Sequence, residues 1–187
     1  MSWETSIKGF KSYLQIERSL SINSVQAYIR DVKKFANYAI PLELNELKIN
    51  REDISEFLNT LQNDNISARS QARIISGIKA FYKYLIIEDY IKHNPTELIE
   101  SPKIGLKLPD TLSLIEIDKL IAAIDLSNKQ GERNRAIIET LYSCGLRVSE
   151  LTNLKLSNIY FNEGYIKVIG KGDKERLAPI GGRALKY

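Results

Sequence analysis

The sequence predicts a mainly α protein, in which a four-helix bundle is joined by a linker to a smaller α+β region with a three-stranded antiparallel sheet. Three observations support this fold class. Apolar residues recur every three or four positions up to residue 85, as they do on one face of a helix. Prolines and lysines then crowd residues 101–110. Near the end of the sequence, glycines separate short runs of aromatic and β-branched residues, which favour strands.

The first two predicted helices precede Pro41. Residues 3–16 place apolar side chains four, three and four positions apart, as on one stripe of an amphipathic helix: Trp3, Ile7, Phe10 and Leu14. The second helix can take Ser21 or Asn23 as its N-cap. We expect Pro41 to end it, because proline cannot continue a helix.

The third and fourth helices complete the predicted bundle. Asn50 can cap the third, and the polar run NDNIS breaks its apolar pattern. The fourth begins near Ser67. Its inner stripe is apolar and consists of Ala72, Ile75, Ile78, Phe81 or Tyr82, and Leu85. Its opposite side carries Arg69, Arg73, Ser76 and Lys83. Four helices of this length can close a small bundle.

Residues 101–110 contain two prolines, a glycine and two lysines, a composition typical of an extended linker. We therefore expect one domain at 1–100 and a second at 111–187.

The second domain is predicted to begin with helices. Ser113 and Glu116 have the spacing of a capping box, so a helix should start at Leu114 and bury the apolar residues Ile117, Leu120, Ile121 and Ile124. Another helix covers 132–144, because Gly145 supplies the left-handed residue that ends helices.

The spacing of the apolar residues changes from a helical to a strand-like pattern after a short helix expected at 148–153. Tyr160-Phe161 and residues 165–169 are rich in aromatic and β-branched residues, and the run NEG marks a turn between them. The run GKGDK marks a second turn before ERLAPI. Three short antiparallel strands are the simplest interpretation.

The composition, 43% hydrophobic and 27% charged, is that of an ordinary globular protein. The apolar runs are shorter than the roughly 18 residues that a membrane helix needs, and the first residues lack the pattern of a signal peptide. We therefore expect a cytoplasmic protein with no membrane partner. One cysteine and one histidine cannot assemble a zinc site from the usual ligands, and we expect no metal or other cofactor.

Basic residues gather in two stretches. Residues 40–64 hold six acids and two bases, whereas residues 66–86 hold four bases and no acid. A second basic surplus follows Tyr165. Two such patches would suit an anionic partner such as nucleic acid, although two solvated surfaces would give the same pattern.

Arg147 follows a helix-ending glycine by two positions and begins the next helix. Its guanidinium would lie at a corner between helices, where it can offer a planar fork of donors to phosphate oxygens. Glu150 lies three positions later on the same helical side and can orient that guanidinium or cap the local backbone. The alternative is an ordinary surface ion pair.

Lys171 lies between Gly170 and Gly172 at the tip of a predicted hairpin. Two residues without side chains allow such a turn to approach a nucleic-acid backbone closely. The alternative is a lysine that simply solvates the turn, and Lys174 is the nearest competitor for any role at this tip.

The segments LYSCGLRVSELTNLKLSNI and VIGKGDKERLAPI resemble the tyrosine recombinases of the phage integrase family, most closely the Xer-type bacterial recombinases. The segments LSINSVQAYIRDVKKF and SARSQARIISGIKAFYKYLI are similar to the family's SAM-like core-binding domain. The resemblance covers nearly the whole chain. It implies that 1–100 is a DNA-clamping domain, that 101–110 is the linker, and that 111–187 is the N-terminal part of a catalytic domain whose C-terminal part is absent.

The resemblance also implies a chemistry, in which DNA is cut and rejoined through a 3′-phosphotyrosyl intermediate. Arg147 would bind the scissile phosphate, Glu150 would support it, and Lys171 would protonate the departing 5′ oxygen as a general acid. We expect duplex DNA as the partner, with no small-molecule substrate, and a tetramer on paired sites for the intact protein. The expected DNA-binding residues are Arg69, Ser70, Arg73, Ser76, Lys79, Lys83, Lys174 and Arg176.

Part of the family's active site is missing from the sequence. It contains no His-x-x-Arg segment, and none of its ten tyrosines has the C-terminal context of the family's nucleophile. We therefore expect this chain to bind DNA without recombining it. A non-catalytic DNA-binding accessory protein and a helical protein-interaction module are the alternatives, and the resemblance does not separate chromosome-dimer resolution from integration or inversion.

Overall fold

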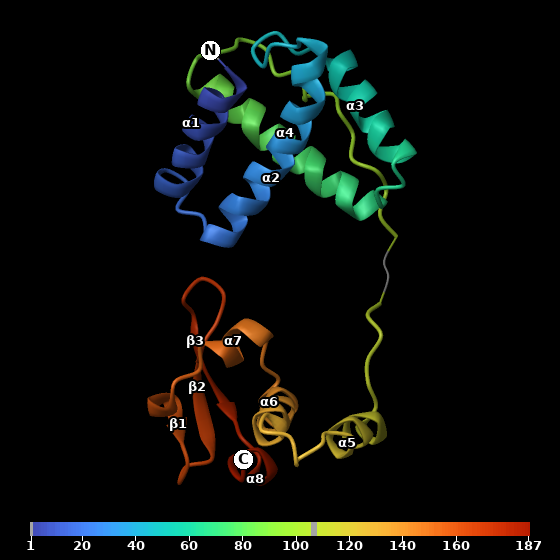
Figure 1. The fold of residues 1–187 in the computed structure, drawn as a ribbon. Coiled ribbons are helices and arrows are strands. Elements are labelled where there is room, and N and C mark those ends of the chain that lie inside the picture. The colour runs from blue at the N-terminus through green and yellow to red at the C-terminus, as the bar shows by residue number, and fades with distance from the viewer. Residues whose placement is uncertain (1, 106–107) are drawn as a thin grey trace. The chain divides into compact units, whose positions relative to one another are not determined.

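The computed structural model describes residues 2–105 and 108–187. The chain divides into two compact units, Met1–Lys107 and Leu108–Tyr187 (Figure 1). The first unit is helical and the second combines helices with a small sheet. None of the helices in the described ranges is both long and apolar enough to cross a membrane.

The four predicted helices of the first unit are all present. They are α1 (Trp3–Ile16), α2 (Ile22–Ala39), α3 (Arg51–Asn63) and α4 (Ala68–Ile87), with a short 3₁₀ turn at Ile40–Leu42 after α2. Local caps fix where the helices begin. Ser21 and Ser67 accept hydrogen bonds from backbone N–H groups of α2 and α4, and Asn50 forms a full capping box with Asp53. These side chains satisfy donors that a helix start would otherwise leave unpaired.

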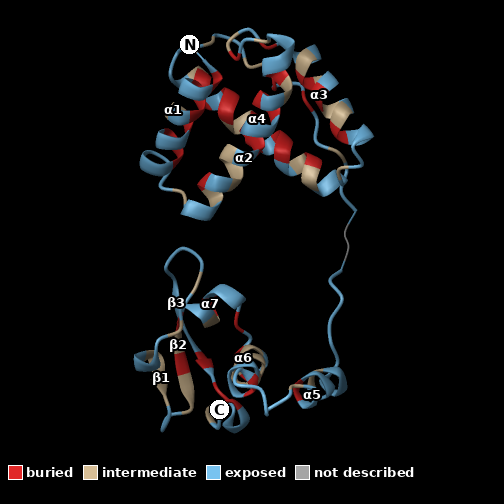
Figure 2. Cartoon of the chain, in the orientation of Figure 1, coloured by how far each residue is buried: buried red, intermediate tan, exposed pale blue. Residues whose placement is uncertain are grey.

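An aromatic core holds the first unit together. The ring of Trp3 packs against those of Phe35 and Phe81, with centroids 5.5 and 5.9 Å away. Buried residues line the inner sides of all four helices (Figure 2). Helices α2 and α4 approach especially closely at Gly77, where an added Cβ would lie 2.7 Å from the Cβ of Asp31.

The second unit contains four helices and three strands. They are α5 (Leu114–Ala122), α6 (Gly131–Cys144), α7 (Val148–Thr152), β1 (Ile159–Tyr160), β2 (Tyr165–Ile169), β3 (Glu175–Pro179) and α8 (Gly182–Leu185), with a 3₁₀ turn at Leu156–Asn158. The sheet is antiparallel in the order β1-β2-β3. Alternate residues of β2, Ile166 and Val168, are buried, as the period-two pattern of a half-buried strand requires.

Two details of the second unit differ from prediction. Of the four apolar residues expected to form the core face of α5, only Ile121 is buried, and Leu120 is 47% exposed. Phe161 lies just beyond β1 and is exposed. For α5 the apolar pattern predicted the right type of element, but the few neighbouring elements of this unit do not cover every apolar side chain. For Phe161 the pattern extended the strand one residue too far.

Candidate nucleic-acid interface

Arg147 stands at the corner between α6 and α7. Gly145 ends α6 with a φ of 57°, and Arg147 is the N-cap residue of α7. The Arg147 backbone N–H donates to Oε2 of Glu150 over 2.8 Å, and its Nη1 donates to Oε1 over 2.9 Å. Glu150 therefore performs both tasks expected of it, since it caps the helix and orients the guanidinium. The Arg147 side chain remains 71% exposed.

Arg176 joins this cluster from the sheet. Its Nη2 donates to Oε2 of Glu150 over 2.9 Å, across 26 residues of sequence. The Glu150 side chain is only 3% exposed, whereas that of Arg176 is 40% exposed. One buried carboxylate thus holds two guanidinium groups that both reach solvent. The sequence placed Arg176 among general DNA-binding residues and gave no sign of this link, because the link joins two separate elements.

The surroundings of Glu150 favour the charged form of its carboxyl group. The backbone N–H of Arg147 holds the pKa of the Glu150 carboxyl below its usual value, and the guanidinium groups of Arg147 and Arg176 act in the same direction. Hydrogen bonds and cations both favour the charged form of a carboxyl group. The carboxylate is therefore ionised at neutral pH, and its two arginines stay paired with it.

Lys171 lies at the tip of the β2–β3 hairpin. Gly172 and Asp173 adopt positive φ values of 73° and 56°, and the Gly170 N–H donates to the Lys174 carbonyl over 2.8 Å. Lys171 and Lys174 are both exposed. An added Cβ on Gly170 would lie 3.2 Å from Oε1 of Glu150, so the base of this hairpin adjoins the carboxylate that holds the two arginines.

The outer side of α4 carries the second set of predicted residues. Arg69, Arg73, Ser76 and Lys83 are exposed, while Ser70 and Lys79 are half-buried. Two of the hydroxyl groups are engaged locally. Ser70 pairs with the capping Ser67 over 3.0 Å, and Ser76 donates to the Ala72 carbonyl over 2.9 Å. In this arrangement Ser76 can accept a hydrogen bond but cannot donate one to a phosphate.

Arg73 is paired with a residue that the sequence did not single out. Its Nη1 donates to both carboxylate oxygens of Asp31 on α2, over 2.5 and 2.6 Å. Asp31 is buried and Arg73 is half exposed. Arg73 therefore lies on the outer side of α4 but is held there by an ion pair with α2.

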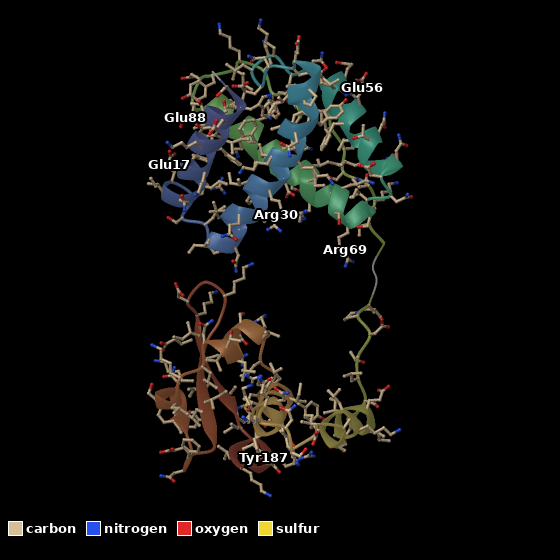
Figure 3. The ribbon with its side chains drawn as sticks, in the orientation of Figure 1. Glu17, Arg30, Glu56, Arg69, Glu88 and Tyr187 are labelled. Atoms are coloured by element: carbon tan, nitrogen blue, oxygen red, sulfur yellow. The ribbon has the colours of Figure 1, made fainter. Side chains whose placement is uncertain are left out.

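A groove of about 880 Å³ between α1 and α2 adds basic residues that the sequence did not reveal as a group. Its lining combines apolar residues with one acidic residue, Glu4, and four basic residues: Lys8, Lys11, Arg30 and Lys33. In Figure 3, Arg30 on α2 and Arg69 on α4 lie along the same edge of the helical unit, while Glu56 and Glu88 lie away from it. Counting charge along the sequence did not predict this grouping, because two of its bases belong to α1 and two to α2.

The described part of the chain offers no group of three His, Cys, Asp or Glu side chains that could hold a metal ion. Cys144 is buried, and this burial raises the pKa of its thiol, which lowers its reactivity.

Comparison with protein families gives two matches. Residues 7–89 match the N-terminal SAM-like domain of phage integrases, and residues 111–187 match the phage integrase family. The tyrosine recombinase XerD of Staphylococcus aureus is 41% identical over 185 residues, which are 98% of this chain and 63% of the relative. This chain thus spans less than two thirds of the length of that relative.

Solved structures share the fold. A lambda integrase tetramer bound to a Holliday junction matches with a TM-score of 0.76 and 21% identity, over 100% of this chain and 54% of that one. The XerH recombinase bound to a palindromic difH substrate matches with a TM-score of 0.70 and 21% identity, over 96% of this chain and 55% of that one.

Proposed function

The chain belongs to the phage integrase family of tyrosine recombinases, and on that basis we propose that it binds duplex DNA and holds a phosphate group of the DNA backbone for strand exchange. The proposal follows the Xer-type relatives, because one of them is 41% identical over almost the whole chain. The strand exchange that we propose would pass through a 3′-phosphotyrosyl link.

The observation that carries this proposal is the Glu150 carboxylate with its two arginines. Arg147 and Arg176 approach the same side chain over 2.9 Å each, and both remain partly open to solvent. Their guanidinium groups are held before any ligand arrives. Preorganised donors of this kind stabilise charge that accumulates on phosphate oxygens in a transition state, because they need no reorganisation as the reaction proceeds. We therefore assign phosphate binding to Arg147, with Arg176 beside it and Glu150 as the residue that positions both.

Lys171 is proposed as the general acid. It extends from a tight glycine-flanked turn whose base adjoins Glu150, and an ammonium on a flexible stem can deliver a proton to a departing oxygen. Lys174, at the other side of the turn, is the alternative donor. The attacking tyrosine is not assigned to any residue of this chain, since no tyrosine here has the family's C-terminal context.

We propose that exposed cations on α2 and on the outer side of α4 contact the duplex. They include Arg30, Arg69 and Lys83. Contacts between such side chains and phosphates contribute affinity that does not depend on the base sequence. The lambda integrase and XerH structures were determined with DNA bound, the former as a tetramer. A tetramer on paired DNA sites is accordingly the proposed assembly during strand exchange.

Binding to a fluorescently labelled duplex over a range of salt concentrations tests this function. Each neutralised phosphate releases condensed counterion, so the logarithm of affinity should fall with the logarithm of salt concentration with a slope of several units. Lys83→Ala should reduce the magnitude of that slope by about one unit. Lys48→Ala, an exposed lysine in the acidic stretch, is the matched control and should leave the slope unchanged.

An affinity that does not depend on salt, or no binding at low salt, would contradict the proposal. A slope that both lysine variants reduce equally would show that binding follows net charge instead of the proposed surface.

A further inference from the structure

The ion pair between Asp31 and Arg73 lies within the surface proposed to bind DNA. It joins α2 to the outer side of α4, where Arg69 and Lys83 also lie. The Asp31 side chain is 4% exposed and that of Arg73 is 51% exposed. The carboxylate is therefore hidden beneath its guanidinium, and the guanidinium is the part that a ligand would meet.

The backbone fixes the position of the carboxylate. Gly77 brings α4 so close that an added Cβ would lie 2.7 Å from the Cβ of Asp31 and 3.3 Å from its Oδ2. Asp31 consequently has little room to change its rotamer. Because this side chain is held rigidly, it can hold Arg73 in turn.

The geometry of the pair leaves one edge of Arg73 available. Both carboxylate oxygens accept from Nη1, and within the described ranges Nε and Nη2 of Arg73 have no hydrogen-bond acceptor. Nε and Nη2 form one edge of the planar guanidinium and point their hydrogens in nearly the same direction. This pair of donors matches the O6 and N7 acceptors that guanine presents in the major groove.

We propose that Asp31 is a positioning residue for sequence recognition, which holds Arg73 so that its Nε–Nη2 edge can read a guanine. This inference rests on the proposed DNA-binding function and adds to it a base class and a residue that controls specificity. An arginine on a free stem would lose rotamer freedom when it binds. The ion pair with Asp31 already restricts the rotamers of Arg73 before DNA binds, so less conformational entropy is lost on binding.

The same carboxylate should weaken binding that does not depend on sequence. It places a negative charge close to Arg30, Lys34 and Arg73, whose cations lie near enough to influence it. A negative charge there opposes the phosphate backbone. The position of Asp31 thus predicts opposite effects on specific and on non-specific affinity, which a merely structural ion pair would not produce.

The test compares wild type with Asp31→Asn, which keeps the shape of the side chain and removes its charge. Duplexes selected by the wild-type chain from a randomised pool would give its preferred sequence, and affinities for that duplex and for a scrambled one would then be measured. Asp31→Asn should lose at least about fivefold of the discrimination at one G·C pair. Its affinity for the scrambled duplex should stay the same or rise.

Two further variants define the mechanism. Arg73→Ala should lose the same base preference. The double variant, which carries both Asp31→Asn and Arg73→Ala, should lose no more discrimination than Arg73→Ala alone, because Asp31 acts only through Arg73. Glu56→Gln, which removes an exposed negative charge from α3, is the matched control and should retain the full discrimination.

If Asp31→Asn does not fold, Arg73→Lys provides a second test of the same proposal. Lysine keeps the cation and its pairing with Asp31 but lacks the planar edge of donors, so it should retain the salt dependence and lose the guanine preference.

The inference is overturned if Asp31→Asn keeps the wild-type preference for the G·C pair, or if Asp31→Asn weakens binding equally on every duplex. It is also overturned if the wild-type chain binds DNA with a steep salt dependence but selects no sequence. In all three cases the proposed DNA-binding function stands. A wild-type chain that binds no duplex at low salt would instead remove that function, and the inference with it.

Discussion

Two buried carboxylates, Asp31 and Glu150, hold arginines on the proposed binding surfaces, and the balance of forces on them differs. Glu150 accepts from a backbone N–H and from two guanidinium groups, so its pKa is lowered. Among the described residues, only Arg73 donates a side-chain hydrogen bond to the Asp31 carboxylate. Its burial outweighs the effects of Arg73 and of the neighbouring cations Arg30 and Lys34, and its pKa is raised from the ordinary value of 3.8. Pairing with arginine favours the charged form at both sites, but at Asp31 the effect of burial is larger.

These shifts predict opposite effects of pH on stability. The lowered pKa of Glu150 gives a stabilisation that is complete above its ordinary value of 4.5 and is lost as the pH falls through the folded-state pKa. The raised pKa of Asp31 gives a stabilisation that is complete below 3.8 and is lost as the pH rises through the folded-state pKa. Glu150→Gln should therefore lose stability relative to wild type as the pH rises toward 4.5, and Asp31→Asn should gain stability relative to wild type as the pH rises above 3.8.

Urea unfolding of the wild type and both variants, repeated between about pH 3 and pH 7, would measure these differences. A stability difference that changes with pH in the same direction for both variants would contradict the assignment.

At the scale of the elements, helices α2 and α4 can approach each other closely because Gly77 has no side chain. At Gly77 a methyl group would lie 2.7 Å from the Cβ of Asp31, which is too close for two packed carbon atoms. Alanine favours a helix by about 1 kcal/mol over glycine, but overpacking usually costs about 1–3 kcal/mol. Because both helices are anchored in the core, we expect the steric cost to exceed the helical gain.

Gly77→Ala should accordingly lower the free energy of unfolding by about 1 kcal/mol, as measured by urea denaturation. Ser76→Ala, on the exposed side of the same helix, is the control and should change it by less than about 0.5 kcal/mol. A Gly77→Ala chain at least as stable as wild type would show that α2 and α4 can move apart without lowering the free energy of unfolding.

The same elements show what a single sequence can predict. The starts of α2, α3, α4 and α5 follow from caps within four residues of each helix, so their signal is local. The core face of α5 was predicted less well, because Leu120 and its apolar neighbours need a covering element before they can be buried. Periodicity identifies the apolar side of a helix, but it does not say how much of that side another element covers.

Across the whole molecule, the contacts that shape the candidate sites join distant parts of the chain. Arg73 meets Asp31 across 42 residues, and Arg176 meets Glu150 across 26. Composition and spacing carry no signal for such pairs. The motifs indicated Arg147 and Lys171 through their resemblance to a family, and the spacing of Arg147 to Glu150 indicated a local pair. That Glu150 also holds Arg176 depends on the tertiary structure, which brings a side chain of β3 to one of α7.

The two units of the molecule should differ in stability. The first buries a continuous cluster of large side chains that includes Trp3, Phe10 and Phe81. The second buries a smaller cluster centred on the aliphatic residues Ile166 and Val168, and α5 leaves Ile115 67% exposed. Hydrophobic stabilisation grows with the apolar area removed from water. The C-terminal unit should therefore unfold at a lower urea concentration than the N-terminal unit.

Trp3 allows the two transitions to be separated. It is the only tryptophan of the chain and packs inside the first unit, so its fluorescence reports on that unit alone. Circular dichroism reports on the helices of both units. If the units unfold independently, the circular dichroism signal should begin to fall at a urea concentration where the fluorescence is still native. Coincident transitions would contradict this expectation, because they would require the smaller core to be stabilised by coupling to the larger one.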